Sequence, residues 1–265
     1  MGEFAFFWRA IRVVARILFV RLLGWDVRVE GREHLPEDTG AVLAFNHHSY
    51  VDVVFVAWGP VVENRRPVRF LAKAELFRHW ASGWLVRAAG AVPVERRAAG
   101  GSSRAHAYTA AVQALAAGEL VAVAPEQTIS ESYELLPFKP GVARMAIESG
   151  APIVPAIGWG SHRSVPKGHS RRPRRRIPVI IRYCEPVVPQ PGETVAALIA
   201  RLQQVMASAL DEVQRAYPDE PSDGDDWWVP ARLGGSAPDH AAVVAAHQAR
   251  FRARRSRGDS GEAAS

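Results

Sequence analysis

The sequence predicts an α/β fold in which helices cover a mixed, largely parallel sheet. Short, continuous apolar runs alternate along the chain with longer segments of helical composition, which is the pattern of parallel strands buried on both faces. Hydrophobic residues make up 48% of the 265 residues and charged residues 23%, so the chain can bury a core of its own. This length fits one domain of about 200 residues with tails better than two full domains.

Seven segments have the composition of strands. The clearest is Ala41–Phe45 (AVLAF), a continuous apolar run of the kind found in strands that are covered on both faces. The first segment, Trp25–Glu30, instead alternates between apolar and polar residues. The other predicted strands are Val68–Ala72, Ala91–Val94, Leu120–Ala124, Ile153–Ile157 and Ile177–Tyr183.

Five further segments have the composition of helices. Gly90, Gly118 and Gly150 directly follow three of them, and a glycine is suited to end a helix because it readily takes the left-handed backbone conformation. The predicted helices are Tyr50–Trp58, Glu75–Ala89, Ala105–Ala117, Gly141–Ser149 and Thr194–Tyr217.

The N-terminal segment, residues 1–25, predicts an amphipathic helix at a membrane interface. At 100° per residue one face carries Phe4, Phe7, Trp8, Ile11, Val14, Leu18 and Leu22, and the opposite face carries Arg9, Arg12 and Arg16. Each arginine at the centre of a spanning helix costs roughly 2.5–3.5 kcal/mol, so three of them disfavour a span. We expect the helix to lie in the headgroup layer of an anionic membrane surface; packing on the domain's own core is the alternative.

The charge and the cysteine content indicate partners and compartment. The chain carries 33 Lys and Arg residues against 27 Asp and Glu, a formal net charge of +6 at pH 7, which suggests an anionic partner. Nucleic acid, phospholipid and phosphorylated substrates all qualify. Cys184 is the single cysteine, so a disulfide-stapled secreted module is excluded. Together with the N-terminal segment, these features predict a peripheral membrane protein on the cytoplasmic face.

Two segments stand outside the alternating pattern. The loop His162–Arg176 carries seven basic residues and no acid, and it has none of the patterns that accompany nucleic-acid binding, so we expect no nucleic-acid partner. Anionic headgroups, coenzyme A phosphates and a solvated loop remain as explanations. Residues 219–265 predict a polar, partly disordered tail with a helix over Pro238–Arg255, and Trp227 and Trp228 are expected to dock on the body or on lipid.

The stretch Asn46–Asp52 (NHHSYVD) carries the chemistry. A histidine that leaves a buried strand at its carboxyl end lies where open α/β folds bind ligands. Asp52 lies one turn into the next predicted helix, so its carboxylate can reach the His47 imidazole, fix the tautomer and stabilise the imidazolium. Ser49 is better placed as a helix cap than as a nucleophile. The pair therefore predicts a general base whose nucleophile is a substrate alcohol attacking an activated acyl group.

Other chemistries lack their motifs. The sequence has no G-x-S-x-G elbow, P-loop, G-x-G-x-x-G fingerprint or H-E-x-x-H. His47, His48 and Asp52 lack the cysteine or well-spaced third histidine that would complete a metal site. We therefore expect neither a metal nor a resident cofactor.

The same stretch resembles the first block, N-H-x-S-x-x-D, of the PlsC-like glycerolipid acyltransferases. Three further blocks of that family follow in order: Gly90–Arg96 (GAVPVER), Pro125–Ser130 (PEQTIS) and Ile153–Ile157 (IVPAI). Lys73 and the segment Phe138–Gly141 (FKPG) also lie where the family has a basic residue and an F-K-x-G turn. The resemblance covers roughly residues 26–185. We predict an interfacial helix over residues 1–25, an acyltransferase domain over residues 26–218 and a tail over residues 219–265.

The resemblance implies the glycerolipid acyltransferase fold and a reaction. A fatty acyl group would pass from acyl-CoA or acyl-carrier protein, as co-substrate, to the free hydroxyl of a lysophospholipid, with 1-acylglycerol 3-phosphate as the expected acceptor. His47 would be the base and Asp52 its orienting acid. The family's substrate-binding positions fall on Lys73, Arg96, Glu126, Thr128, Asn46 and Ser49.

The third block departs from the family pattern P-E-G-T-R-S. Gln127 replaces its glycine and Ile129 replaces its arginine, and the second change removes a charge-assisted contact with phosphate. A different lysolipid or glycolipid acceptor therefore stays open as an alternative. A catalytically silent lipid-binding homologue is a further alternative.

Overall fold

In a computed structural model, which describes residues 2–63, 66–73, 78, 83, 87, 91–94, 102–170 and 174–262, seven strands form one sheet. The strands are β1 (Asp26–Glu30), β2 (Ala41–Phe45), β3 (Val68–Lys73), β4 (Val92–Val94), β5 (Leu120–Val123), β6 (Ile153–Trp159) and β7 (Pro178–Tyr183). Their order is β1-β7-β6-β2-β5-β3-β4, and every neighbouring pair is parallel except β6 with β7. The predicted mixed, largely parallel sheet is confirmed.

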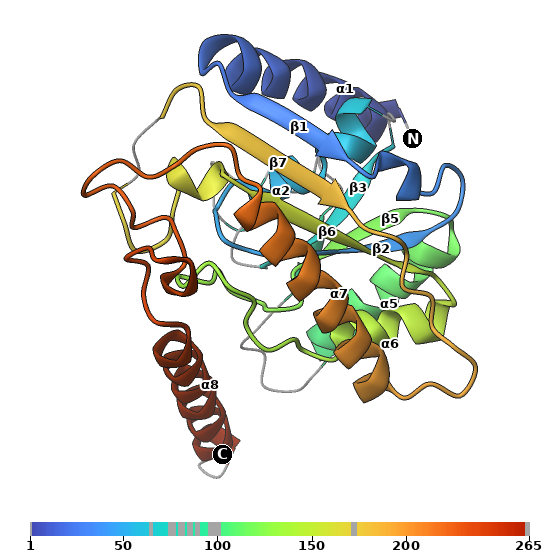
Figure 1. Cartoon of the computed structure of the whole chain (residues 1–265). Coiled ribbons are helices and arrows are strands. Elements are labelled where there is room, and N and C mark those ends of the chain that lie inside the picture. The colour runs from blue at the N-terminus through green and yellow to red at the C-terminus, as the bar shows by residue number, and fades with distance from the viewer. Residues whose placement is uncertain are drawn as a thin grey trace.

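Helices cover both faces of this sheet (Figure 1). The elements are α1 (Gly2–Ala15), η1 (Arg16–Leu22), η2 (Arg32–His34), α2 (Asp52–Val56), η3 (Trp58–Glu63), α5 (Ser102–Ala116), α6 (Gly141–Ser149), η4 (Ser161–Arg163), α7 (Val195–Arg215), η5 (Ala231–Leu233) and α8 (His240–Glu262). The predicted helix over Glu75–Ala89 falls largely outside the described residues.

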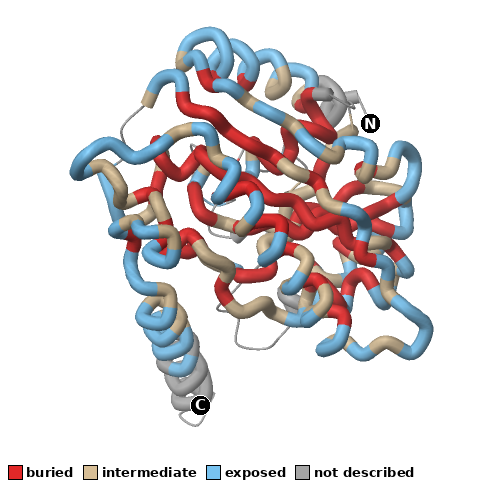
Figure 2. Tube along the Cα trace, viewed as in Figure 1, coloured by how far each residue is buried: buried red, intermediate tan, exposed pale blue. Residues whose placement is uncertain are grey.

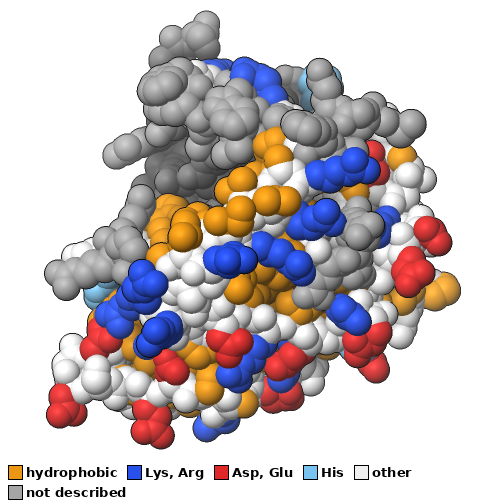
Figure 3. Space-filling model, turned by 90° about the horizontal axis from the view of Figure 1, so that it is seen from above, with side chains coloured by type: hydrophobic (Ala, Val, Ile, Leu, Met, Phe, Trp, Pro, Cys, Tyr) orange, Lys and Arg blue, Asp and Glu red, His pale blue; other side chains and the backbone are white. Residues whose placement is uncertain are grey.

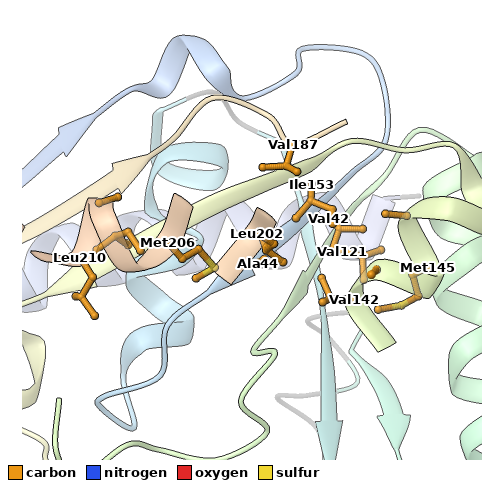
Figure 4. Packing of buried hydrophobic residues seen from close by; sticks show 14 of the residues in the cluster. Val42, Ala44, Val121, Val142, Met145, Ile153, Val187, Leu202, Met206 and Leu210 are labelled. Carbon is orange, nitrogen blue, oxygen red and sulfur yellow. The ribbon is translucent and has the colours of Figure 1, made fainter. Parts of the chain in front are cut away.

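The central strand β2 shows how the sequence builds two hydrophobic layers. Val42 and Ala44 face one layer, where they join Val142 and Met145 of α6 and Leu202 of α7 (Figure 4). Ala41, Leu43 and Phe45 face the opposite layer, which α1, η1, α2 and η3 cover. All five side chains of β2 are buried, so the strand lies in the interior of the molecule (Figure 2). This explains the unbroken apolar run, because a strand covered on both faces has no solvent side.

The N-terminal helix packs on the body and also keeps an apolar surface exposed. Trp8 and Phe19 are 8% and 9% exposed, and the Phe19 ring lies 5.0 Å from that of Phe55. Val14 and Leu18, from the predicted apolar face, are exposed. The predicted single face already divides within α1, where Trp8 and Ala15 face the core and Val14 faces solvent. Beyond α1 the chain continues as the π-helix η1, whose wider turns no longer follow a 100° period. The side chain of Phe4 lies outside the described residues.

No helix in the described part of the chain is both long and apolar enough to cross a membrane.

The tail docks on the body before it projects as α8 (Figure 1). Trp228 is 2% exposed and packs beneath the Arg163 guanidinium, which lies 4.3 Å from the ring centroid. Arg174 binds both carboxylate oxygens of Asp225 at 2.5 and 2.6 Å. The predicted docking of the tryptophan pair on the body is confirmed for Trp228. The limits of the three predicted segments stay predictions.

Candidate active site

The His47 imidazole and the Asp52 carboxylate lie together at the carboxyl end of β2. Nδ1 of His47 is 3.1 Å from Oδ2 of Asp52, as the spacing of the two residues predicts. The imidazole side chain is 20% exposed, whereas the carboxylate is 3% exposed. A proton on Nδ1 faces the carboxylate, so Nε2 carries the lone pair that a general base needs.

Backbone and side-chain donors fix the Asp52 carboxylate. Oδ2 also accepts hydrogen bonds from the backbone N–H groups of His48 and Ser49, each at 2.7 Å. Oδ1 accepts a hydrogen bond from the Ser161 hydroxyl at 2.8 Å. These donors stabilise the ionised carboxylate and prevent it from rotating away from His47. The carboxylate at the first residue of α2 thereby folds back over the turn that precedes the helix.

Ser49 is therefore not the helix cap that the sequence predicts. Val51 occupies the N-cap position of α2 without a side-chain hydrogen bond. The Ser49 hydroxyl donates to the Val165 carbonyl at 2.8 Å and accepts a hydrogen bond from Val51 N at 3.3 Å. The hydroxyl ties the segment Asn46–Asp52 to the loop after η4. That Ser49 is no nucleophile stays a prediction.

The second histidine of the pair has a different environment. His48 is 1% exposed, and burial lowers its pKa to about 3, so the ring is neutral. Its Nδ1 lies 3.1 Å from the Asn46 amide nitrogen. His47 is therefore the histidine of the two whose imidazole can meet a substrate.

Asn46 braces the same segment from the other side. Its amide oxygen accepts a hydrogen bond from Gly158 N at 2.7 Å, and its amide nitrogen donates to the Gly158 carbonyl at 2.9 Å. These two bonds join the end of β2 to β6. Asn46 and Ser49 are 1% and 0% exposed, and their side chains form hydrogen bonds within the protein. The substrate-binding role that the resemblance implies for them stays a prediction.

Glu126 lies beneath His47 and is completely buried. One carboxylate oxygen accepts a hydrogen bond from His47 N at 3.0 Å, and the other accepts one from Leu136 N at 2.9 Å. Burial raises the Glu126 pKa to about 8, while these two N–H groups act in the opposite direction. Glu126 therefore holds the backbone at His47 against that at Leu136, and the predicted contact with the acceptor stays a prediction.

The structure describes the other predicted site residues, Thr128, Lys73 and Arg96, only in part. Thr128 is half-buried in the loop after β5. Lys73 ends β3, with its side chain outside the described residues, and Arg96 lies outside them altogether. Strands β2, β5, β3 and β4 are parallel neighbours, so their carboxyl ends lie at one edge of the sheet.

The altered third block has a distinct backbone. Gln127 has a φ of 58°, in the left-handed region where glycine is favoured, which accounts for the family's glycine at this position. Ile129, where the family has arginine, is 6% exposed. The change from arginine to isoleucine therefore turns this position into part of the core.

Ser161 is a site residue that sequence reasoning did not find. It contacts Asp52 from 109 positions away, and no local motif marks it. Ser161 follows the Ile153–Ile157 block by four residues, and it reaches Asp52 because β6 lies beside β2 in the sheet. Among the described residues, no group of three or more His, Cys, Asp or Glu side chains could hold a metal ion.

Known proteins are similar to this chain in sequence. Residues 26–159 match a family model described as acyltransferase. The chain is 33% identical over 134 residues to the 1-acyl-sn-glycerol-3-phosphate acyltransferase of Bacillus subtilis (strain 168), covering 51% of this chain and 63% of that protein. It is 29% identical over 171 residues to the protein of that name from Limnanthes douglasii, covering 64% and 57%. The matched regions thus span less than two thirds of these relatives.

A solved structure also resembles the chain. The crystal structure of the 1-acyl-sn-glycerophosphate (LPA) acyltransferase PlsC from Thermotoga maritima superposes with a TM-score of 0.62 at 26% sequence identity. The match covers 78% of this chain and 79% of that one.

Proposed function

The chain belongs to the acyltransferase family, and on this premise we propose that it transfers a fatty acyl group to the free hydroxyl of 1-acylglycerol 3-phosphate. The observation that carries the proposal is the His47–Asp52 pair, whose imidazole is accessible and has no protein nucleophile bound to it among the described contacts. The relatives' names support the acceptor. The acyl donor is a thioester, either acyl-CoA or acyl-carrier protein.

The geometry suits a direct transfer. Nε2 of His47 accepts the proton of the acceptor hydroxyl as its oxygen attacks the thioester carbonyl. Asp52, held by Ser161 and two backbone N–H groups, stabilises the imidazolium that forms. The tetrahedral intermediate then collapses, the carbon–sulfur bond breaks, and the imidazolium returns its proton to the leaving thiolate. The thioester supplies its own activation, so the proposal needs no acyl-enzyme.

In the proposed function, the apolar patch on α1 and η1 faces the membrane. Six large apolar side chains on these helices are 42–57% exposed: Val13, Val14, Ile17, Leu18, Val20 and Leu22. Figure 3 shows hydrophobic side chains gathered on this face of the molecule, with Lys and Arg side chains around them. Burying a half-exposed aliphatic side chain in lipid contributes about 1 kcal/mol, so the six together would hold the protein on a membrane as a peripheral protein. The cytoplasmic face is the side that the sequence predicts.

Vesicle binding tests that placement. Val14→Glu with Leu18→Glu places two charges in the patch at exposed positions and should abolish cosedimentation with vesicles that contain phosphatidylglycerol. Val188→Glu is the control, because Val188 is 55% exposed outside the patch. Unchanged cosedimentation of the double variant would contradict the role of the patch.

The acceptor is tested with a panel of lysolipids and radiolabelled acyl-CoA, read by product chromatography. We expect label in phosphatidic acid when 1-acylglycerol 3-phosphate is offered. Label only in the product of another lysolipid or a glycolipid would favour the alternative acceptor that Gln127 and Ile129 suggest. No transfer to any acceptor, from acyl-CoA or acyl-carrier protein, would support the catalytically silent homologue and overturn the proposal.

A further inference from the structure

Lys167 comes to the catalytic segment from a distant part of the chain. It lies in the loop after η4, two residues beyond Val165, whose carbonyl accepts hydrogen bonds from Ser49 Oγ at 2.8 Å and Tyr50 N at 3.3 Å. Pro166 also forms a β-bridge with Ser49. This part of the basic loop is therefore fixed against the segment that carries His47 and Asp52.

The Lys167 ammonium reaches the altered third block. Its Nζ lies 3.3 Å from the backbone carbonyl of Ile129. The next residue, Ser130, donates its backbone N–H to the His47 carbonyl at 2.8 Å. The positive charge of Lys167 thus lies at the backbone of Ile129, one residue from the hydrogen bond that joins Ser130 to His47. This is the position at which the third block has isoleucine instead of arginine.

The ammonium is available to a stronger partner. Its ion pair with Glu131 is 3.5 Å long, well above the 2.7–2.9 Å typical of a charge-assisted hydrogen bond. The Lys167 and Glu131 side chains are partly exposed, at 26% and 30%, and a long ion pair that solvent reaches contributes little to stability. An ammonium has three donors, so Lys167 can keep its contact with the Ile129 carbonyl and exchange the long contact with Glu131 for phosphate oxygens.

We propose that Lys167 binds a substrate phosphate and supplies the cationic contact that Ile129 cannot make. This inference rests on the proposed acyl transfer, and it assigns a ligand residue to that same site. The phosphate belongs either to the acceptor or to the coenzyme A of the donor. Lysine is a point charge without the bidentate fork of arginine, so the contact places fewer geometric demands on the headgroup.

Kinetics with the full chain test the proposal. Lys167→Met should raise the KM for 1-acylglycerol 3-phosphate about 10-fold or more, which corresponds to a loss of about 1.4 kcal/mol, with kcat less affected. The KM for a monoacylglycerol without phosphate should not change. Lys167→Arg keeps the charge and should restore most of the affinity. Arg175→Gln, at an exposed position in the same loop, is the matched control.

The donor arm separates the two phosphate sources. A rise in the KM for acyl-CoA, with the acceptor KM unchanged, would assign the contact to coenzyme A. Calorimetric binding of glycerol 3-phosphate and of coenzyme A to wild type and Lys167→Met gives a readout that needs no turnover. If wild type binds either probe and Lys167→Met does not, the phosphate site stands even if no acyl transfer is found. Unchanged KM values and unchanged binding of both probes would overturn it.

Discussion

Ser161→Ala removes a single hydroxyl that, in the proposed mechanism, acts on the reaction through Asp52. Ser161 is 2% exposed, and its Oγ donates a 2.8 Å hydrogen bond to Asp52 Oδ1. A hydrogen bond to a charged group contributes about 1.5–3 kcal/mol, and a buried acceptor that loses its partner is costly. The three donors on Oδ2 remain, so the carboxylate keeps its contact with His47 but loses part of its orientation.

We expect kcat to fall about 10- to 100-fold while the acceptor KM changes little, because Ser161 has no proposed contact with substrate. Thermal unfolding, followed in parallel, should show a loss of about 1–3 kcal/mol. Ser161→Thr keeps the hydroxyl and should retain most of the turnover. A Ser161→Ala protein with wild-type kcat would refute the idea that the orientation of Asp52 limits the reaction.

Three further predictions concern stability. Because burial raises the folded-state pKa of Glu126 to about 8, above its ordinary 4.5, its contribution is complete below pH 4.5 and is lost as the pH rises through 8. The melting temperature should therefore fall more steeply over that range in wild type than in Glu126→Gln. Gln127→Gly should add about 0.5–1 kcal/mol in urea unfolding, by relieving a left-handed backbone; a loss would contradict the strain. Trp228→Ala should cost about 3–5 kcal/mol in the same assay, and a cost below 1 kcal/mol would show that the tail is not docked.

The parts of the fold that the sequence predicted are those that local composition determines. The run Ala41–Phe45 matches β2 residue for residue, and Gly141–Ser149 matches α6. The predicted N-terminal face was only partly right: within α1 the core side is centred on Trp8 and Ala15, which leaves Val14 exposed, and from Arg16 to Leu22 the chain forms the π-helix η1, which does not follow the 100° period. Periodicity gives the apolar face of a helix but not which edge of that face packs on the core, and tertiary packing decides this for Trp8 and Val14.

In the candidate site, too, the sequence predicted local contacts and not those that depend on tertiary packing. His47 and Asp52 could be paired from sequence because five residues separate them and a short turn brings them together. Ser161, the partner of Asp52, and Lys167, the partner of the third block, could not be found from sequence. Both contacts depend on the packing of β6 and the loop after it against β2. Glu126 was found by motif, but its complete burial follows from tertiary structure.

The central claim is that His47 is the general base of acyl transfer. The most direct measurement is the kcat of purified His47→Ala with 1-acylglycerol 3-phosphate and acyl-CoA, with circular dichroism and thermal unfolding to show that the protein is folded. The account predicts a loss of about 1,000-fold or more, as for other oriented histidine bases. A folded His47→Ala protein that keeps kcat within about 10-fold of wild type would contradict it.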